Sequence, residues 1–406
     1  MMTMSVQLQL RRGEMSKQRR MRLPPRSPSA RTNLILMTLA YALVGIFLVV
    51  QLPGASPDLA MDSVDGQSLL VEVEETTPCA ILFFGLPRAF ESLVLPSVRK
   101  NVLQTNPACD VYVHYYNQTL DRPGRSGKGG RIHPGDVYLL DEYASSVTYQ
   151  GESEHEFLEK RGDLLQKIST VKDSQDRLLY FPWKERTYNN RTVENVIRMW
   201  HSIESAWSLM EREASRRNIQ YKRVAMLRND VVYLTPIYLD EYAADNTAVV
   251  PGFGRYPVSD RMVYGPYEAV RVWASERFER IDEHARWILK NDEGRALHAE
   301  TFMNVTIFPA MRKALGNSLG IVEHPHCCFL RSRADETVWM TDCDYNPRRQ
   351  DVTLSSIGSG IGNIMDRLEN VLGRRCIGWP YTIDHGFKAV NCARHWRSLR
   401  GYSDDL

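Results

Sequence analysis

A β-α-β succession of hydrophobic patterns constrains the fold of this chain more than any other feature of the sequence. The segment "CAILFFG" (79–85) is a short, continuous apolar run that ends in glycine, which is typical of a strand buried on both faces. Apolar residues at helical spacing follow in 89–106, where Pro96 interrupts the pattern, and "CDVYVHYYN" (109–117) indicates a second strand. Two buried strands joined by a helix form the crossover unit of an α/β sheet. We therefore predict an α/β domain with a mixed, mostly parallel sheet flanked by helices.

The clearest helix signal lies in 192–218, which precedes a polar interruption in a buried strand. We expect Thr192 to cap this helix, which has one apolar stripe of Val193, Val196, Ile197, Trp200, Ile203, Trp207 and Met210. The next segment, "YKRVAMLRNDVVYLTPI" (221–237), places the strand "RVAML" directly before Arg228, Asn229 and Asp230. Because ligands bind at the carboxyl ends of strands in open α/β sheets, we expect Arg228 and Asp230 to face a ligand. The alternative is an ion pair that supports the strand end.

The N-terminal part of the chain has the pattern of a membrane anchor. Residues 1–31 carry eight Arg or Lys and one Glu, and residues 34–52 form a run of 19 residues without a charge. At about 1.5 Å per residue such a helix spans roughly 28 Å, close to the thickness of the hydrocarbon core. The positive-inside rule places the basic tail in the cytosol. We expect a type II single-pass protein with a cytosolic tail (1–32), a transmembrane anchor (33–52), a Pro-, Gly- and acid-rich stem (53–78) and a lumenal domain (79–406). A buried helix or a cleaved signal peptide is the alternative.

The remaining composition fits a globular domain in the secretory pathway. From residue 79 onward, basic and acidic residues are nearly balanced, which argues against nucleic acid as a partner. Glycosylation sequons begin at Asn117, Asn190 and Asn304, all after the anchor. Seven cysteines suit an oxidising compartment, and we expect three disulfides. The candidate pairs are Cys79 with Cys109, the Cys327-Cys328 doublet (Cys328 foremost) with Cys343, and Cys376 with Cys392.

At residues 221–237 the chain resembles glycosyltransferases of the GT-A fold, a Rossmann-like superfamily that uses nucleotide-diphospho-sugars. In that family a comparable strand ends in an Asp-x-Asp motif followed by apolar residues and proline, whereas Arg228 replaces the first acid here. The order of elements over roughly 79–345 also resembles the family. The resemblance implies a nucleotide-sugar donor, a glycan or glycoprotein acceptor, a Golgi membrane location and a Mn²⁺ or Mg²⁺ cofactor. The cation would stabilise the leaving diphosphate, with Asp230 as a ligand. Arg228 is alternatively suited to hold the phosphate itself.

The same resemblance suggests roles for residues elsewhere in the chain. Gly85 and Arg88 follow the first strand, the region that binds the nucleotide in this family. Asp260 precedes a predicted helix and would contact a sugar hydroxyl or cap that helix. Glu300, on another predicted helix, is the first candidate for the base that takes the acceptor proton and Asp260 the second; the alternative for Glu300 is a solvated helix face. His324 or His326 would complete a metal shell.

Two other classes of protein remain open from the sequence. Golgi sulfotransferases are also type II proteins, and they bind a sulfated nucleotide at a turn with Pro-Lys/Arg followed by Gly-Thr-Thr. The present chain keeps Pro87-Arg88 but lacks Gly-Thr-Thr. A non-catalytic lumenal lectin or pseudoenzyme is the other alternative, because the first carboxylate of Asp-x-Asp is missing.

Overall fold

The computed structural model describes residues 78–123, 129–242, 245–254, 256–291, 294, 296–316, 318–324, 327–339, 361–373 and 389–391, which belong to a unit that spans Val73–Leu406. The predicted cytosolic tail, anchor and nearly all of the stem lie outside the described residues. So do His326, Cys343, Cys376 and Cys392. None of the helices within the described ranges is both long and apolar enough to cross a membrane.

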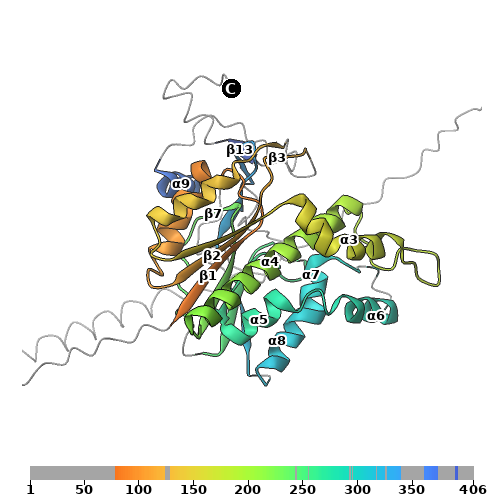
Figure 1. Ribbon diagram of the computed structural model, residues 1–406. Coiled ribbons are helices and arrows are strands. Elements are labelled where there is room, and N and C mark those ends of the chain that lie inside the picture. Colours follow the sequence, from red (N-terminus) through yellow and green to blue (C-terminus); the bar gives the residue numbers. More distant parts are fainter. Residues whose placement is uncertain are drawn as a thin grey trace, which may run out of the picture. The chain divides into compact units, whose positions relative to one another are not determined.

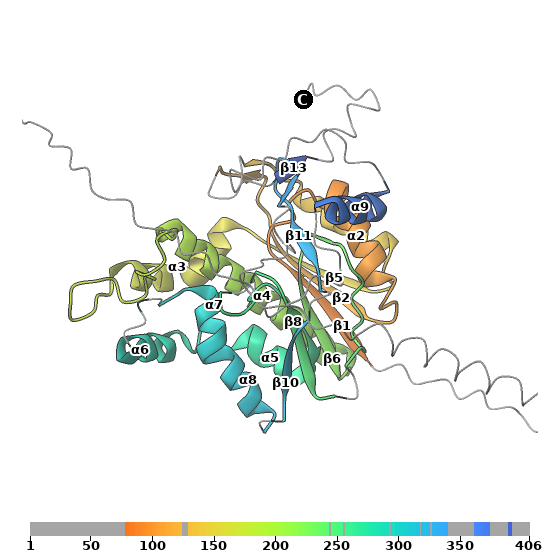
Figure 2. The ribbon, with the colours of Figure 1, turned by 180° about the vertical axis from the view of Figure 1, so that it is seen from behind.

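A seven-stranded sheet organises this unit, and its strands lie in the order β10-β8-β9-β6-β1-β2-β5 (Figure 1). The strands are β1 (Cys79–Phe84), β2 (Asp110–Tyr116), β5 (Val147–Glu152), β6 (Arg223–Arg228), β8 (Thr247–Pro251), β9 (Val263–Pro266) and β10 (Gly320–His324). All run in one direction except β9, which pairs antiparallel with both β6 and β8. Seen from behind, β10 lies on the side of α8, and β2 and β5 on the side of α2 (Figure 2). The predicted mixed, mostly parallel sheet is confirmed.

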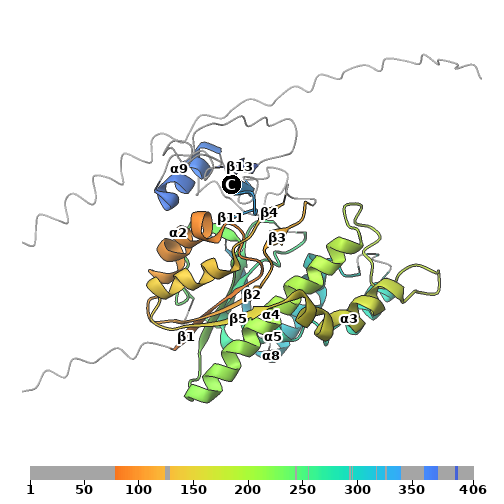
Figure 3. The same ribbon diagram turned by 45° about the horizontal axis from the view of Figure 1, so that its top comes forward.

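Helices cover both faces of the sheet. One group consists of η1 (Phe90–Val94), α2 (Leu95–Val98), η2 (Arg99–Leu103), η3 (Pro134–Glu142) and α9 (Ile361–Leu372). The other consists of α3 (Glu154–Thr170), α4 (Asn190–Arg217), α5 (Tyr267–Ser275), α6 (Ile281–Asn291), α7 (Ala299–Phe302), η4 (Met303–Ile307) and α8 (Phe308–Ala314). The two groups lie on opposite sides of the strands (Figure 3). Short antiparallel pairs join β3 (Leu120–Asp121) to β4 (Gly130–Arg131), β7 (Val231–Tyr233) to β11 (Phe329–Arg331), and β12 (Thr337–Trp339) to β13 (Ala389–Asn391).

The two-sided cover explains why β1 is a continuous apolar run. Successive side chains of a strand point to opposite faces. Ile81 and Phe83 accordingly pack into the core beneath η1, α2 and η2, whereas Leu82 and Phe84 pack into the core beneath α4. All six residues of β1 are buried. A strand exposed on one face would alternate apolar with polar residues, so the run itself encodes a central position.

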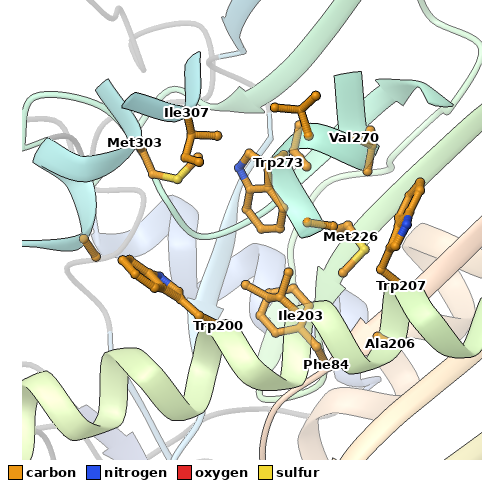
Figure 4. Packing of buried hydrophobic residues seen from close by; sticks show 14 of the residues in the cluster. Phe84, Trp200, Ile203, Ala206, Trp207, Met226, Val270, Trp273, Met303 and Ile307 are labelled. Atoms are coloured by element: carbon orange, nitrogen blue, oxygen red, sulfur yellow. The ribbon is translucent and has the colours of Figure 1, made fainter. Parts of the chain in front are cut away.

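The long helix α4 is the main apolar cover of the second face. It begins at Asn190, and its N-cap is Asn189 rather than the predicted Thr192. The Asn189 side chain accepts a hydrogen bond from the Thr192 N–H, and Thr192 Oγ1 bonds back to the Asn189 N–H, because a residue inside the first turn reaches back to the cap. The predicted apolar stripe is buried, with Trp200, Ile203 and Trp207 turned toward the sheet and α5 (Figure 4). The helix therefore holds β1, β6 and α5 together.

Candidate active site

The sheet topology brings the predicted site residues to one edge. Because β1 and β6 are parallel, Arg88 and Asp230, which follow them, lie at the same edge. The antiparallel strand β9 starts at this edge, so Asp260, just before it, lies there as well. Arg88, Arg228 and Asp230 are in direct contact, and Asp260 acts electrostatically on Arg228. The edge is therefore a single site rather than a set of separate charges.

Asp230 binds two arginine side chains with both carboxylate oxygens. Its Oδ1 accepts a hydrogen bond from Arg228 Nε at 2.7 Å, and its Oδ2 accepts from Arg228 Nη2 and Arg88 Nη1, each at 2.9 Å. Asp230 is buried, which opposes ionisation, but the charges of Arg228 and Arg88 hold the pKa of its carboxyl at about 2. The Arg88 and Arg228 side chains are 20% and 18% exposed. Solvent, or a ligand, therefore reaches the arginines and not the carboxylate between them.

The turn after β1 requires glycine at position 85. Gly85 has φ of 110°, and a Cβ there would lie 3.2 Å from Asn229 Oδ1. Its N–H donates to Ser202 Oγ at 2.9 Å, and its carbonyl accepts from Asn229 Nδ2 at 3.1 Å. The Asn229 N–H in turn donates to the Phe84 carbonyl at 3.1 Å. These bonds tie the end of β1 to the end of β6 and to α4, and so fix the position from which Arg88 extends.

A buried polar network behind this turn was not predicted from the sequence. His114 Nδ1 lies 2.7 Å from Ser202 Oγ, and its Nε2 lies 2.9 Å from Glu152 Oε2. Glu152 also contacts His201 Nε2 at 2.8 Å and Lys160 Nζ at 2.6 Å. Burial opposes ionisation of Glu152, but these hydrogen bonds hold its pKa well below the usual range. The residues are far apart in sequence, so no spacing pattern could have identified them. The network supports the turn at Gly85.

A third arginine, which the sequence did not single out, follows β11 and acts electrostatically on Asp230 and Arg88. The backbone N–H and Oγ of Ser332 both donate to the Asp230 carbonyl at 2.9 Å, which holds the end of β11 against the site. The next residue, Arg333, is only 7% exposed. Burial, together with the neighbouring charges of Arg331 and Arg88, lowers the pKa of Arg333 to about 9. The only sequence signal was the basic pair in "FLRSRAD", which has no characteristic spacing.

Asp260 and Glu300 are two carboxylates that interact electrostatically, and Asp260 also acts on Arg228. The Glu300 side chain, on α7, is 17% exposed, which contradicts a solvated helix face. Burial and the nearby charge of Asp260 raise the pKa of Glu300 to about 8. Its Oε2 lies 3.3 Å from His298 Nε2 but has no hydrogen-bond partner among the described residues. The N-cap of α5 is Pro266, so Asp260 is not the predicted cap.

Arg277, a residue that the sequence did not single out, lies near this pair. It is 1% exposed, and its Nε donates to the Trp273 carbonyl at 2.8 Å while its guanidinium lies 3.9 Å from the centre of the Trp273 ring. Neither Nη atom has a hydrogen-bond partner within the described part of the chain. Burial lowers the pKa of Arg277 to about 9, and the charge of Asp260 opposes this. Arg277 therefore adds positive charge beneath Asp260.

The residues at the site do not fit the expected divalent cation. A metal at Asp230 would have to displace the guanidinium groups that occupy both of its oxygens. The predicted second ligand, His324, ends β10, and its Nε2 lies 3.2 Å from Glu241 Oε1. Two strands separate β10 from β6, so three strand spacings, roughly 14 Å, lie between them. Within the described ranges, no three or more His, Cys, Asp or Glu side chains are grouped to hold a metal ion.

The cysteines and sequons follow the predicted pattern where the structure describes them. Cys79 and Cys109 form a disulfide that joins the start of β1 to the residue before β2, as predicted. Cys328 is also disulfide-bonded, whereas Cys327 is a buried thiol. The sequon residues Asn117, Asn190 and Asn304 are all exposed.

Comparisons with known proteins identify no family. No family model matches the chain, and no curated protein matches it. Among solved structures, one match is the apo form of mouse xyloside xylosyltransferase 1, with a TM-score of 0.31 and 10% sequence identity. The alignment covers 61% of this chain and 84% of that chain. A likeness at this TM-score carries no argument about function.

Proposed function

We propose that this chain is a glycosyltransferase that moves a sugar from a nucleotide-diphospho-sugar to a hydroxyl of a glycan or glycoprotein. The observation that carries the proposal is that cationic and acidic groups with complementary roles in sugar transfer lie at one site. An arginine cluster suited to a diphosphate lies at the same sheet edge as the Asp260–Glu300 pair, and Asp260 acts electrostatically on both Arg228 and Glu300. One end of the site is thus suited to a leaving group and the other to a nucleophile.

The arginine end of the site acts on the bond that breaks. When the bond between the anomeric carbon and the diphosphate oxygen breaks, negative charge develops on the diphosphate. Guanidinium groups held in place before the reaction stabilise such charge without reorganisation. Arg88 and Arg228 meet this requirement because Asp230 and Asp121 already fix their positions. In this proposal they bind the donor and stabilise the departing nucleoside diphosphate.

The carboxylate end of the site acts on the bond that forms. The acceptor oxygen bonds to the anomeric carbon, and its proton passes to a carboxylate. Glu300 is the first candidate for this base, since an effective base has a pKa close to the working pH and the pKa of Glu300 is raised to about 8. Asp260, whose negative charge favours the protonated form of Glu300, would hold a sugar hydroxyl or serve as the second candidate for the base.

A lumenal setting on the Golgi membrane belongs to the same proposal. The Cys79–Cys109 disulfide supports an oxidising compartment, and the exposed sequon asparagines are suited to glycosylation. The anchor at 33–52, which would make the protein a type II membrane protein, stays a prediction from the sequence.

Ligand binding by the full-length protein separates this function from its alternatives. We expect nucleoside diphosphates or their sugar esters to raise the thermal unfolding temperature, by an amount that grows with the logarithm of the ligand concentration divided by Kd. Stabilisation by a 3′-phosphoadenosine sulfonucleotide alone would instead indicate a sulfotransferase. If neither class of nucleotide changes the unfolding temperature, the proposal is wrong and a lectin or pseudoenzyme becomes the better account.

A further inference from the structure

We propose that Arg88 and Arg228, supported by the nearby charge of Arg333, bind the donor diphosphate without a bridging divalent cation, and that Asp230 is the anion that holds Arg88 and Arg228 in place. This inference rests on the proposed function and specifies how its donor is recognised. In the Asp-x-Asp resemblance the second acid is a ligand to a metal. Here Asp230, which occupies that position, instead supports the arginine side chains that bind the donor.

The first step is the occupancy of Asp230. Three N–H donors from two guanidinium groups reach its two oxygens at 2.7 to 2.9 Å. Removing these donors to admit a cation would leave Arg228 without its paired carboxylate, and Arg88 with Asp121 alone, at a partly buried position. The free-energy cost of separating buried, hydrogen-bonded charges is large, so the observed pairing favours retention of the cluster when a ligand binds.

The second step is the charge that the cluster presents. The guanidinium groups of Arg88 and Arg228 pair with the carboxylates of Asp121 and Asp230. The charges of Arg333 and Asp260 act on this group from nearby. Arg331 adds to the positive field, because its charge lowers the pKa of Arg333. The cluster therefore gathers several guanidinium groups at one place. A diphosphate carries two negative charges and is the kind of ligand that grouped guanidinium groups bind.

The third step is the availability of N–H donors. Arg228 Nη1 faces Met199 Sδ at 3.6 Å, and a thioether is only a weak hydrogen-bond acceptor. Arg88 Nη2 has only a long contact of 3.5 Å to Asp121 Oδ1. Both side chains are partly exposed, so a phosphate oxygen could accept from these atoms while the bonds to Asp230 persist. The planar arginine fork suits phosphate oxygens in this geometry.

Isothermal titration of the full-length protein with UDP, GDP and ADP, in EDTA and in Mn²⁺, tests the inference. For at least one nucleotide we expect an affinity in EDTA that is within about threefold of that in Mn²⁺. Inorganic pyrophosphate, which lacks the base, should compete with that nucleotide in EDTA. Binding only in the presence of Mn²⁺ would overturn the inference and leave the proposed function standing. Absence of binding in both conditions would overturn both.

Substitutions place the binding site. Arg228→Gln and Arg333→Gln each remove donors to a charged ligand and should weaken nucleotide binding about 10- to 100-fold in EDTA. Arg228→Lys keeps the charge but loses the fork, so it should bind with intermediate affinity. Arg271→Gln, a matched variant on the surface of α5 that pairs with Glu268 and Glu276, should bind as the unchanged protein does. Circular dichroism confirms that each variant is folded. Unchanged affinity in folded Arg228→Gln and Arg333→Gln would contradict the arginine cluster.

Discussion

At the scale of the residue, Asp230 is a structural counter-ion as well as part of a proposed donor site. Asp230→Asn removes the negative charge between Arg88 and Arg228, which leaves Arg228 without its paired carboxylate and Arg88 with Asp121 alone, in a partly buried position. We expect the free energy of unfolding at pH 7 to fall by about 3–5 kcal/mol, as measured by urea denaturation. Asp163→Asn, which alters an exposed residue of α3, is the control and should change it by less than about 0.5 kcal/mol.

The low pKa of Asp230 gives this prediction a pH dependence. Because the pKa of about 2 in the folded protein lies below the ordinary aspartate value of 3.8, the ionised carboxylate stabilises the fold at higher pH. That contribution is present above about pH 4 and is lost as the pH falls through 3.8 toward 2. The difference in unfolding free energy between the two proteins should therefore shrink in acid. A difference that is constant from pH 6 to pH 3 would be inconsistent with this assignment.

Glu300 has the opposite behaviour, because its folded pKa is raised from 4.5 to about 8. Ionisation of this buried carboxyl costs stability progressively as the pH rises from 4.5 through 8. Glu300→Gln removes that cost, so we expect the variant to be more stable than the unchanged protein at pH 9, by ~1–3 kcal/mol, and similar to it at pH 4. Thermal unfolding across this range measures the effect. Glu283→Gln, which alters an exposed carboxylate on α6, should show no such gain in stability as the pH rises.

At the scale of the element, α4 links the packing of the core to the shape of the site. Its apolar stripe packs on β1 and β6, while Ser202 on the same helix holds the Gly85 N–H. Ile203→Ala leaves a cavity between α4 and the sheet and should lower the unfolding free energy by about 2–5 kcal/mol in a denaturant titration. Arg216→Ala, at an exposed position near the end of α4, should have little effect. Equal effects of the two substitutions would contradict the packing role.

At the scale of the whole molecule, the sequence predicted what depends on local pattern. The buried strands β1, β2 and β6, the helix α4 and the placement of Arg228 and Asp230 at a strand end all follow from periodicity and from the interruption of an apolar run. The antiparallel position of β9 does not, because strand order is set by packing between distant segments.

The same limit holds for the site: local sequence patterns identified some of its residues, and residues brought in by long-range contacts were missed. Arg333 and Arg277 reach it through long-range contacts that have no motif in the sequence, and so does the network around His114. The prediction that His324 completes a metal shell with Asp230 relied on the family resemblance alone. It did not take account of the two strands that lie between them.

We propose that the site with Arg88, Arg228, Asp230 and Glu300 catalyses sugar transfer from a nucleotide-sugar. The most direct measurement is release of nucleoside diphosphate from a panel of nucleotide-sugars by the full-length protein, supplied with mixed glycan acceptors, in EDTA and in Mn²⁺. The account predicts release from at least one donor, a loss of about 100-fold or more in Glu300→Gln, and no loss in Arg271→Gln. Release that is unchanged in folded Glu300→Gln, or no release from any donor by the folded protein, would contradict it.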